Sequence, residues 1–504
     1  MIEYISTRDS SHKVSSSKAI LDGQAPDGGL YIPEDLSEIA LDYHDVIDKD
    51  FKGMAEAVWN KFFPDYGEET ISELVSASYD GKFSSPEITP LTEVGCNYVL
   101  ELFHGPTAAF KDVALSALPN LMTKARELND FTDRILILTA TSGDTGSAAL
   151  HGFSDVPGTG IIVFYPHEGV SDTQKLQMVT AGGSNTCAVA VRGNFDDAQT
   201  GVKALFREIP HPVRGVSLSS ANSINIGRLV PQIVYYFSAY KQLLEAGAIT
   251  DGDKVNFAVP TGNFGDIMAG YFALKMGLPV NRLICASNSN DVLTEFLETG
   301  HYNRKRTFHK TTSPSMDILV SSNLERLLYY VCGEEHTREY MQALSENGEY
   351  QLTPEELEKI KSVFVGICAN DEEGSSAIGD IYHNYNYLMD THTSIAWACL
   401  RKYRDKEWAY SGCSDGDDSA AQHHAVNVIL STASPYKFCS SVLTAIGEEL
   451  ELSDEMNMLK CHEITGVPVP EGLSKLFGRE IRHRDVIEVA DMKKYVIDHA
   501  EKQV

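Results

Sequence analysis

Short apolar runs recur along the chain from Asn97 onward, and each is followed by a polar turn and then by a helical pattern. Continuous apolar strands that alternate with helices are typical of parallel sheets covered on both faces. The pattern therefore predicts an α/β fold with parallel-rich sheets. The strands are expected at residues 98–102, 135–139, 160–165, 186–191, 255–259, 283–286 and 427–430.

Three regions depart from this alternation. Residues 1–92 combine polar turns with a helix-like stretch at 51–63, which predicts a small N-terminal cap domain. Between residues 295 and 406 strand signals become rare and helical periodicity dominates, as at 354–369, so a helical elaboration is expected there. Residues 411–424 form a polar stretch that is typical of a surface loop.

The charge balance limits the ligands to be expected. The chain has 504 residues, with 71 acidic and 42 basic side chains and a formal net charge of −29. A nucleic acid bound through a broad basic face needs Lys and Arg to neutralise its phosphates, so no nucleic-acid partner is expected. A small anionic ligand is not excluded, because it needs only a few local donors.

The cysteines and the apolar segments predict a protein of a reducing compartment, most simply the cytoplasm. Nine cysteines are spread through the chain, and no two have the C-x-x-C spacing of a zinc or redox motif. Neither a disulfide framework nor a metal site is therefore expected. The polar N-terminus lacks the apolar segment of a secretory signal, and no apolar run is long enough to span a bilayer.

Residues 254–270 (KVNFAVPTGNFGDIMAG) predict a strand, a glycine-containing turn and a helix that begins near Asp266. Backbone N–H groups at such a junction, together with the positive end of the helix, form a phosphate cradle that needs no cation. Gly262 and Gly265 would let the backbone approach the anion closely. The segment is neither G-x-G-x-x-G nor a P-loop, so it does not predict a dinucleotide or ATP site. The alternative is an ordinary turn between a strand and a helix.

Residues 101–115 (ELFHGPTAAFKDVAL) place Lys111 in the first turns of a predicted helix. A lysine at this end of a helix is electrostatically unfavourable, and the residues directly before it are apolar. Such a lysine would have a depressed pKa and could act as a Schiff-base nucleophile. The alternative is a lysine that reaches solvent and pairs with Asp112.

Three further polar segments are candidates for ligand binding, and the first and third of them follow predicted strands. Residues 140–148 (ATSGDTGSA) concentrate hydroxyls and amides at a helix start, which suits an anion or plain capping by Ser142 or Asp144. Residues 219–228 (SSANSINIGR) end in Arg228, which could clamp a phosphate or be an ordinary surface group. Residues 427–438 (NVILSTASPYKF) end a strand at a polar turn, where Thr432 either faces a ligand or caps a helix.

These junctions are more informative together than singly. Ligands of α/β sheets gather at the carboxyl ends of the strands, where all five segments are expected to lie. One reactive lysine beside two anion sites suggests pyridoxal phosphate together with a phosphorylated substrate.

The same segments resemble threonine synthases, fold-type-II pyridoxal-phosphate enzymes, in the longer form shared by many bacteria and fungi. The resemblance covers nearly the whole chain and rests on the motifs YISTR (4–8), APDGGLYIPE (25–34), HGPTAAFKD (104–112), ATSGDTGSA (140–148), VRGNFDDAQ (191–199), ANSINIGRL (221–229), PTGNFGDI (260–267), SPSMDI (313–318), SNLERLL (322–328) and STASPYKF (431–438). It implies an N-terminal cap at 1–92, a large cofactor-binding α/β domain at 93–110 and 240–504, and a small α/β domain at 111–239.

The resemblance also implies a reaction and roles for individual residues. O-phospho-L-homoserine and water would give L-threonine and phosphate. Lys111 would carry the cofactor in a Schiff base and act as the acid and base, and Thr432 would hydrogen-bond the pyridine nitrogen. The cofactor phosphate would be held by Gly262, Asn263, Phe264, Gly265 and Asp266, and the substrate by Thr141, Ser142, Asp144, Thr145, Asn222 and Arg228.

One motif departs from the family pattern, and two other functions fit the cofactor motifs. The family often has Asp-Pro-His-Thr where residues 390–393 read Asp-Thr-His-Thr, which frees the backbone at Thr391. We interpret His392 as structural rather than catalytic.

The alternative functions are a threonine-synthase-like phospho-lyase that releases 2-oxobutyrate and a non-catalytic ligand-binding relative. A monomer or a homodimer is expected.

Overall fold

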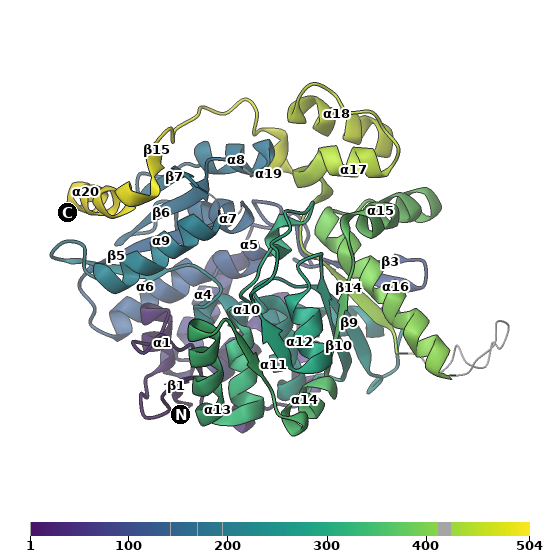
Figure 1. Cartoon of the computed structure of the whole chain (residues 1–504), viewed down its shortest axis with the longest axis horizontal. Coiled ribbons are helices and arrows are strands. Elements are labelled where there is room, and N and C mark those ends of the chain that lie inside the picture. The colour runs from purple at the N-terminus through teal and green to yellow at the C-terminus, as the bar shows by residue number, and fades with distance from the viewer. Residues whose placement is uncertain (1, 142, 169, 194, 412–424, 504) are drawn as a thin grey trace.

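Two parallel-rich sheets, each flanked by helices, form the centre of the molecule (Figure 1). The predicted α/β fold is therefore confirmed. Of the loop expected at 411–424, residues 412–424 lie outside the described part of the chain. The computed structural model describes residues 2–141, 143–168, 170–193, 195–411 and 425–503.

The larger sheet has six strands in the order β13-β10-β9-β14-β4-β3. The pairs from β13 to β4 are parallel, and β3 adds an antiparallel edge. Every residue of β9 and β14 is buried, which explains why the sequence shows both strands as continuous apolar runs. The strands are β3 (Leu91–Val94), β4 (Asn97–Glu101), β9 (Val255–Pro260), β10 (Val280–Ser287), β13 (Phe364–Cys368) and β14 (Asn427–Ser431).

The second sheet has five strands, all parallel, in the order β15-β7-β6-β5-β8. All eight residues of β6 are buried between the helices on its two faces. The strands are β5 (Arg134–Ala140), β6 (Thr159–Pro166), β7 (Thr186–Arg192), β8 (Val216–Ser220) and β15 (Val486–Glu488). The helices that follow β5, β6 and β7 are α7 (Asp144–Phe153), α8 (Asp172–Val179) and α9 (Phe195–Glu208).

The N-terminal segment shares its hydrophobic core with the helices of the larger sheet. The central helix of this core is α10 (Ile226–Glu245), in which every residue from Ile226 to Tyr240 is buried. Phe62 packs against Phe272, with ring centroids 5.5 Å apart. The other elements of this core are β1 (Tyr4–Ser6), α1 (Ser16–Asp22), β2 (Tyr31–Pro33), α2 (His44–Ile47), α3 (Phe51–Phe62), α4 (Glu68–Tyr79), α5 (Lys111–Leu115), α6 (Leu118–Leu128) and α11 (Gly265–Met276).

The region between 295 and 406 contains more strand than its helical periodicity predicts. The expected helix at 354–369 is wrong in its second half, because α14 (Pro354–Lys361) ends early and β13 then joins β10 as an edge strand. The run Phe364–Cys368 is apolar, and a short apolar run fits a strand as well as a helix. The remaining elements are α12 (Val292–Thr299), β11 (His301–Asn303), α13 (Leu324–Glu346), β12 (Glu349–Gln351), α15 (Asp371–Tyr385) and α16 (Thr391–Ser411).

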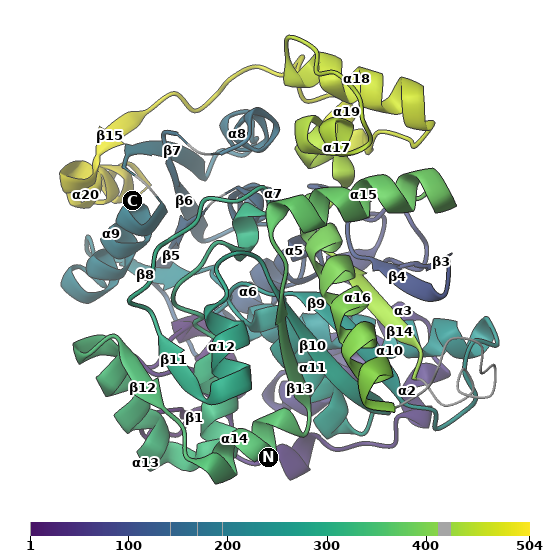
Figure 2. The ribbon, with the colours of Figure 1, turned by 45° about the vertical axis from the view of Figure 1, so that its right-hand side comes forward.

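The C-terminal segment crosses from the larger sheet to the second one. After α17 (Cys439–Ala445), α18 (Asp454–Thr465) and α19 (Glu471–Ser474), strand β15 pairs with β7, and α20 (Met492–Gln503) packs nearby (Figure 2). This differs from the expected assignment of 240–504 to the larger domain. Strand β15 is held by backbone hydrogen bonds, and its first and last residues are exposed. The sequence therefore has no buried apolar run there that would predict a strand. Within the described residues, no helix is both long and apolar enough to cross a membrane.

Candidate active site

A cavity of about 660 Å³ lies where the carboxyl ends of strands from both sheets meet. Its lining includes Ala140 at the end of β5, Ser220 at the end of β8, Pro260 at the end of β9 and Thr432 just after β14. This is the edge at which α/β sheets bind their ligands, because loops and helix N-termini converge there.

The structure brings the predicted site residues together around this cavity. Ser142 lies outside the described residues. The others all line the cavity, and their individual roles toward a ligand stay predictions: Lys111, Thr141, Asp144, Thr145, Asn222, Arg228, Gly262, Asn263, Phe264, Gly265, Asp266 and Thr432.

Lys111 is the first residue of α5, and its side chain is only 11% exposed. The ammonium group lies 4.6 Å from the centroid of the Phe110 ring and 3.7 Å from Asp144 Oδ2. Burial lowers the pKa of Lys111 from its ordinary value; the Asp144 carboxylate opposes this shift, whereas the charges of Lys437 and Arg228 add to it. The amine is therefore easier to deprotonate than that of a surface lysine, as a nucleophile or base requires.

The loop between β9 and α11 forms a close-fitting cradle. A Cβ atom at Gly262 would lie 2.5 Å from the carbonyl oxygen of Ser315, so only glycine fits there without a shift of the backbone. Phe264 has a φ of 62°, which turns the chain into the helix, and Asn323 Nδ2 donates to the carbonyl of Asn263 at 2.8 Å. The N-terminus of the 12-residue α11 supplies backbone N–H groups of the kind that bind phosphate.

Asp266, in the first turn of α11, is a buried carboxyl group with one unused oxygen. Its Oδ1 accepts hydrogen bonds from the hydroxyls of Tyr235 at 2.5 Å and Tyr236 at 3.0 Å, whereas its Oδ2 has no partner among the described residues. Burial raises the pKa of Asp266 to about 6, although both tyrosines and Lys111 favour the charged form. A carboxyl group with this pKa can exchange a proton near neutral pH.

Arg228 is a buried cation without an acidic partner in the described part of the chain. It lies in the first turn of α10, which Asn225 caps by accepting a hydrogen bond from Gly227 N at 2.9 Å. Its Nη1 donates to the carbonyl of Ala221 at 2.5 Å, and its buried Nε has no hydrogen-bond partner among the residues that the structure describes. Burial lowers the pKa of Arg228 to about 10. An uncompensated charge of this kind is costly, and an anionic ligand would offset that cost.

Comparisons with known proteins identify the family. Residues 3–79 match the profile "Threonine synthase N terminus", and residues 83–407 match "Pyridoxal-phosphate dependent enzyme". The threonine synthase of Schizosaccharomyces pombe is 36% identical over 479 residues, which cover 88% of this chain and 92% of that protein. The chain belongs to the threonine synthase family.

Other members of the threonine synthase family are similarly close. The human protein named threonine synthase-like 1 is 37% identical over 429 residues, which cover 80% of this chain and 57% of that protein. The crystal structure of pyridoxal-phosphate-bound threonine synthase from Brucella melitensis has 35% identity and a TM-score of 0.84, and the match covers 99% of each chain. The expected family and its fold are therefore confirmed.

The site fits pyridoxal phosphate, the cofactor named in the matched family profile and bound in the Brucella melitensis structure. A buried lysine amine, a cradle that excludes a Cβ atom and a nearly buried hydroxyl at Thr432 all line one cavity. Gly262 to Asp266 would hold the phosphate, Lys111 would bind the cofactor aldehyde, and Thr432 would face the ring nitrogen. Among the described residues, no three His, Cys, Asp or Glu side chains are placed to hold a metal ion.

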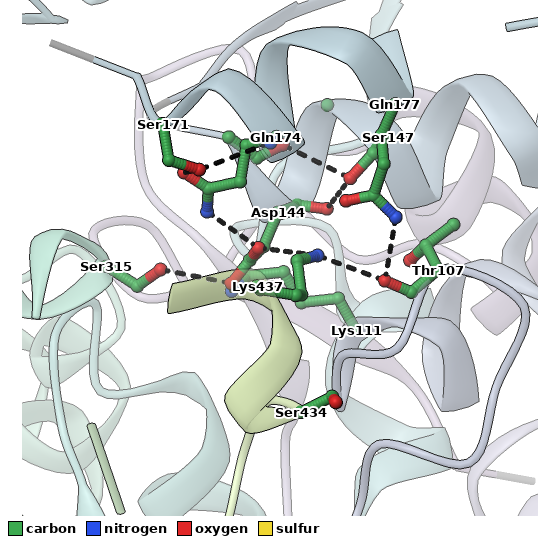
Figure 3. A network of polar contacts seen from close by, with 12 residues as sticks. Thr107, Lys111, Asp144, Ser147, Ser171, Gln174, Gln177, Ser315, Ser434 and Lys437 are labelled. Carbon is green, nitrogen blue, oxygen red and sulfur yellow. Dashed lines mark hydrogen bonds and ion pairs between the residues drawn. The ribbon is translucent and has the colours of Figure 1, made fainter. Parts of the chain in front are cut away.

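Asp144 lines the cavity and also contacts several protein groups (Figure 3), and its role toward the substrate stays a prediction. Its Oδ1 lies 2.7 Å from Lys437 Nζ and accepts a hydrogen bond from Gln174 Nε2 at 2.8 Å. Its Oδ2 lies 3.4 Å from Ser315 Oγ and 3.7 Å from Lys111 Nζ. Burial opposes the charge on Asp144, but Lys437 and Lys111 outweigh it and hold the pKa of this carboxyl below its ordinary value.

Lys437 beside Asp144 was not predicted as a site residue. Lys437 lies in the short 3₁₀ helix η5 (Pro435–Phe438) directly after β14, and its side chain is fully buried. The available signal was a lysine between aromatic residues at the end of the STASPYKF motif. Lysine is rarely buried without a partner, so this context predicts a buried carboxylate opposite it.

The departure from the family motif at Thr391 leaves the local helix start intact. Thr391 is the first residue of α16, a position at which proline is common because the N–H there needs no helical partner. Asp390 accepts hydrogen bonds from the backbone N–H groups of His392 at 2.9 Å and Thr393 at 3.1 Å. The imidazole of His392 contacts Asp390 at 2.7 Å and the N–H of Ser315 at 3.2 Å. These contacts support the structural interpretation of His392, which nevertheless lines the cavity.

Proposed function

We propose that this protein is a threonine synthase that converts O-phospho-L-homoserine and water into L-threonine and phosphate. The observation that carries the proposal is the buried guanidinium group of Arg228, which has no acidic partner among the described residues and shares a cavity with Lys111 and the loop at Gly262. The loop and the guanidinium offer two anion sites beside one amine. A cofactor phosphate and a substrate phosphate would fill them.

Pyridoxal phosphate, when bound, stabilises the negative charge that develops on the substrate carbon atoms. The side chains of this protein would then position the substrate and move its protons. Asn222 and Arg228 would bind the substrate phosphate, and Thr141 with Thr145 would face the rest of the substrate. Because these groups belong to helix starts that follow different strands, they hold the substrate from several sides.

Lys111 would be the acid and base of the reaction. Its amine would take the proton from Cα and then a proton from Cβ, and phosphate would leave from Cγ. Protons would return to Cγ, which becomes the methyl group, and to Cα, and water would add as hydroxyl at Cβ with loss of its other proton. A base must be neutral to accept a proton, and burial lowers the pKa of Lys111 in the required direction.

Product analysis separates this proposal from its alternatives. We expect the purified protein with bound cofactor to form threonine and inorganic phosphate in equal amounts from O-phospho-L-homoserine. Formation of 2-oxobutyrate without threonine would favour the phospho-lyase instead. A protein that binds the substrate without any turnover would be a non-catalytic relative.

Cellular location and assembly are separate questions from the reaction. The cytoplasmic location, the monomeric or homodimeric state and the absence of nucleic-acid partners stay predictions from the sequence. Sedimentation of the purified protein with bound cofactor would test the expected assembly.

A further inference from the structure

Lys437 is a fully buried ammonium group that contacts Asp144, a residue of the cavity wall, and Thr107, both far from it in the sequence (Figure 3). Its Nζ lies 2.7 Å from Asp144 Oδ1 and donates to the carbonyl oxygen of Thr107 at 3.0 Å. The same carbonyl accepts a hydrogen bond from Gln177 Nε2, also at 3.0 Å. The polar contacts of Lys437 are therefore with the protein, and no step of the proposed reaction uses it.

Asp144 links Lys437 to Lys111. One carboxylate oxygen faces each lysine, at 2.7 Å from Lys437 and 3.7 Å from Lys111. Gln174 and Ser315 also contact the carboxylate, from α8 and from the 3₁₀ turn at Pro314–Met316. The carboxylate is thus held in place whether or not Lys111 carries a charge.

A lone carboxylate at this position would work against the role proposed for Lys111. In a buried site an opposite charge within about 4–6 Å stabilises the ammonium form by an energy equivalent to roughly one to three pH units. A second cation on the same carboxylate cancels part of that field and also repels Lys111 directly. Lys437 supplies this second cation.

We propose that Lys437 is a positioning residue of the active site: by pairing with Asp144, it lets this carboxylate orient Lys111 without holding Lys111 in the protonated form. The proposal rests on the role proposed above for Lys111 as a base. In this arrangement the Asp144 carboxylate orients the Lys111 amine. The ion pair with Lys437 limits the stabilisation that the same carboxylate gives to protonated Lys111.

Substitutions at Lys437 or Asp144 leave the other charged groups around Lys111 in place. Arg228 on α10 lowers the proton affinity of Lys111, and Lys111 in turn favours the charged form of Asp266 on α11. His392 on α16 helps to lower the pKa of Asp144 through its charge. Asp112, next to Lys111 on α5, accepts hydrogen bonds from Thr107 N at 2.8 Å and Thr107 Oγ1 at 2.6 Å.

The test measures the protonation of Lys111 directly. The full-length protein, freed of cofactor, is reductively methylated at a series of pH values, and mass spectrometry follows the rate at Lys111. The midpoint of the methylation rate at Lys111 against pH reports the pH at which half of this amine is neutral. For Lys437→Met we expect this midpoint to rise by roughly one pH unit or more. For Asp144→Asn we expect it to fall, because the opposing carboxylate is gone. Lys437→Arg keeps a cation at this place and should stay near the wild-type midpoint.

Lys402→Met is the matched control, because Lys402 forms its ion pair with Glu373 on the surface and should leave the midpoint unchanged. An unchanged or lower midpoint in Lys437→Met would overturn the proposal. If that variant does not fold by circular dichroism, Asp144→Asn decides alone, and an unchanged or higher midpoint there would overturn it. In the protein with bound cofactor, the rising limb of kcat/KM against pH should move to higher pH in Lys437→Met.

The labelling experiment is independent of the reaction. It uses no substrate, so a protein that fails to make threonine can still show the expected shifts of the midpoint. Conversely, normal threonine formation with no shift in Lys437→Met would reject the role of Lys437 and leave the proposed function intact.

Discussion

Lys437 and Asp144 form an ion pair of 2.7 Å in which the two side chains are 0% and 3% exposed. Asp144 begins α7, which follows a strand of the second sheet, whereas Lys437 follows β14 of the larger sheet. The pair therefore connects the two sheets directly beside the reactive lysine. Removing one partner of a buried pair leaves an uncompensated charge, and this is why both positions affect Lys111.

Lys111→Ala removes the attachment point of the cofactor and the proposed base together. We expect the visible absorbance of the lysine-bound cofactor to disappear and kcat/KM to fall by about 10³-fold or more. Absorbance spectra and initial rates measure both effects. A variant that keeps the absorbance band and the turnover would show that another residue carries the cofactor.

Arg228→Met removes the buried guanidinium group while filling a similar volume. Because charge-assisted hydrogen bonds to phosphate are lost, we expect KM for O-phospho-L-homoserine to rise by about 10- to 100-fold. Inhibition by inorganic phosphate should weaken in parallel. Arg401→Met is the control, because Arg401 pairs with Asp380 on the surface. Equal KM values in the wild type and in Arg228→Met would remove Arg228 from the substrate site.

Gly262→Ala tests the cradle. The new Cβ atom would lie 2.5 Å from the backbone oxygen of Ser315, so the loop must shift. We expect the affinity for pyridoxal phosphate to fall by about 10-fold or more, measured by fluorescence titration of the cofactor-free protein. Gly265→Ala is a milder comparison, because its Cβ atom would lie 3.4 Å from the side chain of Asn323. The cradle would be in the wrong place if Gly265→Ala were the more damaging change.

Asp266→Asn tests the buried carboxyl group through pH. The pKa of Asp266 is raised from 3.8 to about 6, so the folded state binds more protons than the unfolded state between these values. This group therefore stabilises the fold at low pH and loses that contribution as pH rises toward 6. As pH rises from 4 to 7, the free energy of unfolding of the asparagine variant should increase relative to that of the wild type by on the order of 2–3 kcal/mol.

Urea unfolding of both proteins at these two pH values, without cofactor, measures this gain. A constant difference between the two proteins across the range would mean that Asp266 ionises normally.

Strands buried on both faces were predictable from the sequence. The seven predicted strands coincide within a few residues with β4, β5, β6, β7, β9, β10 and β14. Strand β13 is apolar but was predicted as part of a helix, whereas two other missed strands give little apolar signal: β8 reads VSLSS, and β15 has three residues. Their positions depend on backbone pairing with a neighbouring strand, which no local pattern records.

The candidate site was predictable where a single sequence motif contains both the loop and the residues proposed to bind or react. The segments around Lys111 and Gly262 each follow a buried strand, and parallel strands bring their carboxyl ends together. The partnership of Lys437 with Asp144 was not predictable, because it joins two sheets whose packing is a tertiary property. The unpaired charge of Arg228 was likewise hidden, since sequence alone does not distinguish a buried arginine from a surface one.

The proposed reaction is tested most directly in ¹⁸O-labelled water. Because phosphate leaves from Cγ with its bridging oxygen and water adds at Cβ, we expect one ¹⁸O atom in the hydroxyl of threonine. The released phosphate should carry none. Labelled phosphate together with homoserine, or 2-oxobutyrate in place of threonine, would contradict it.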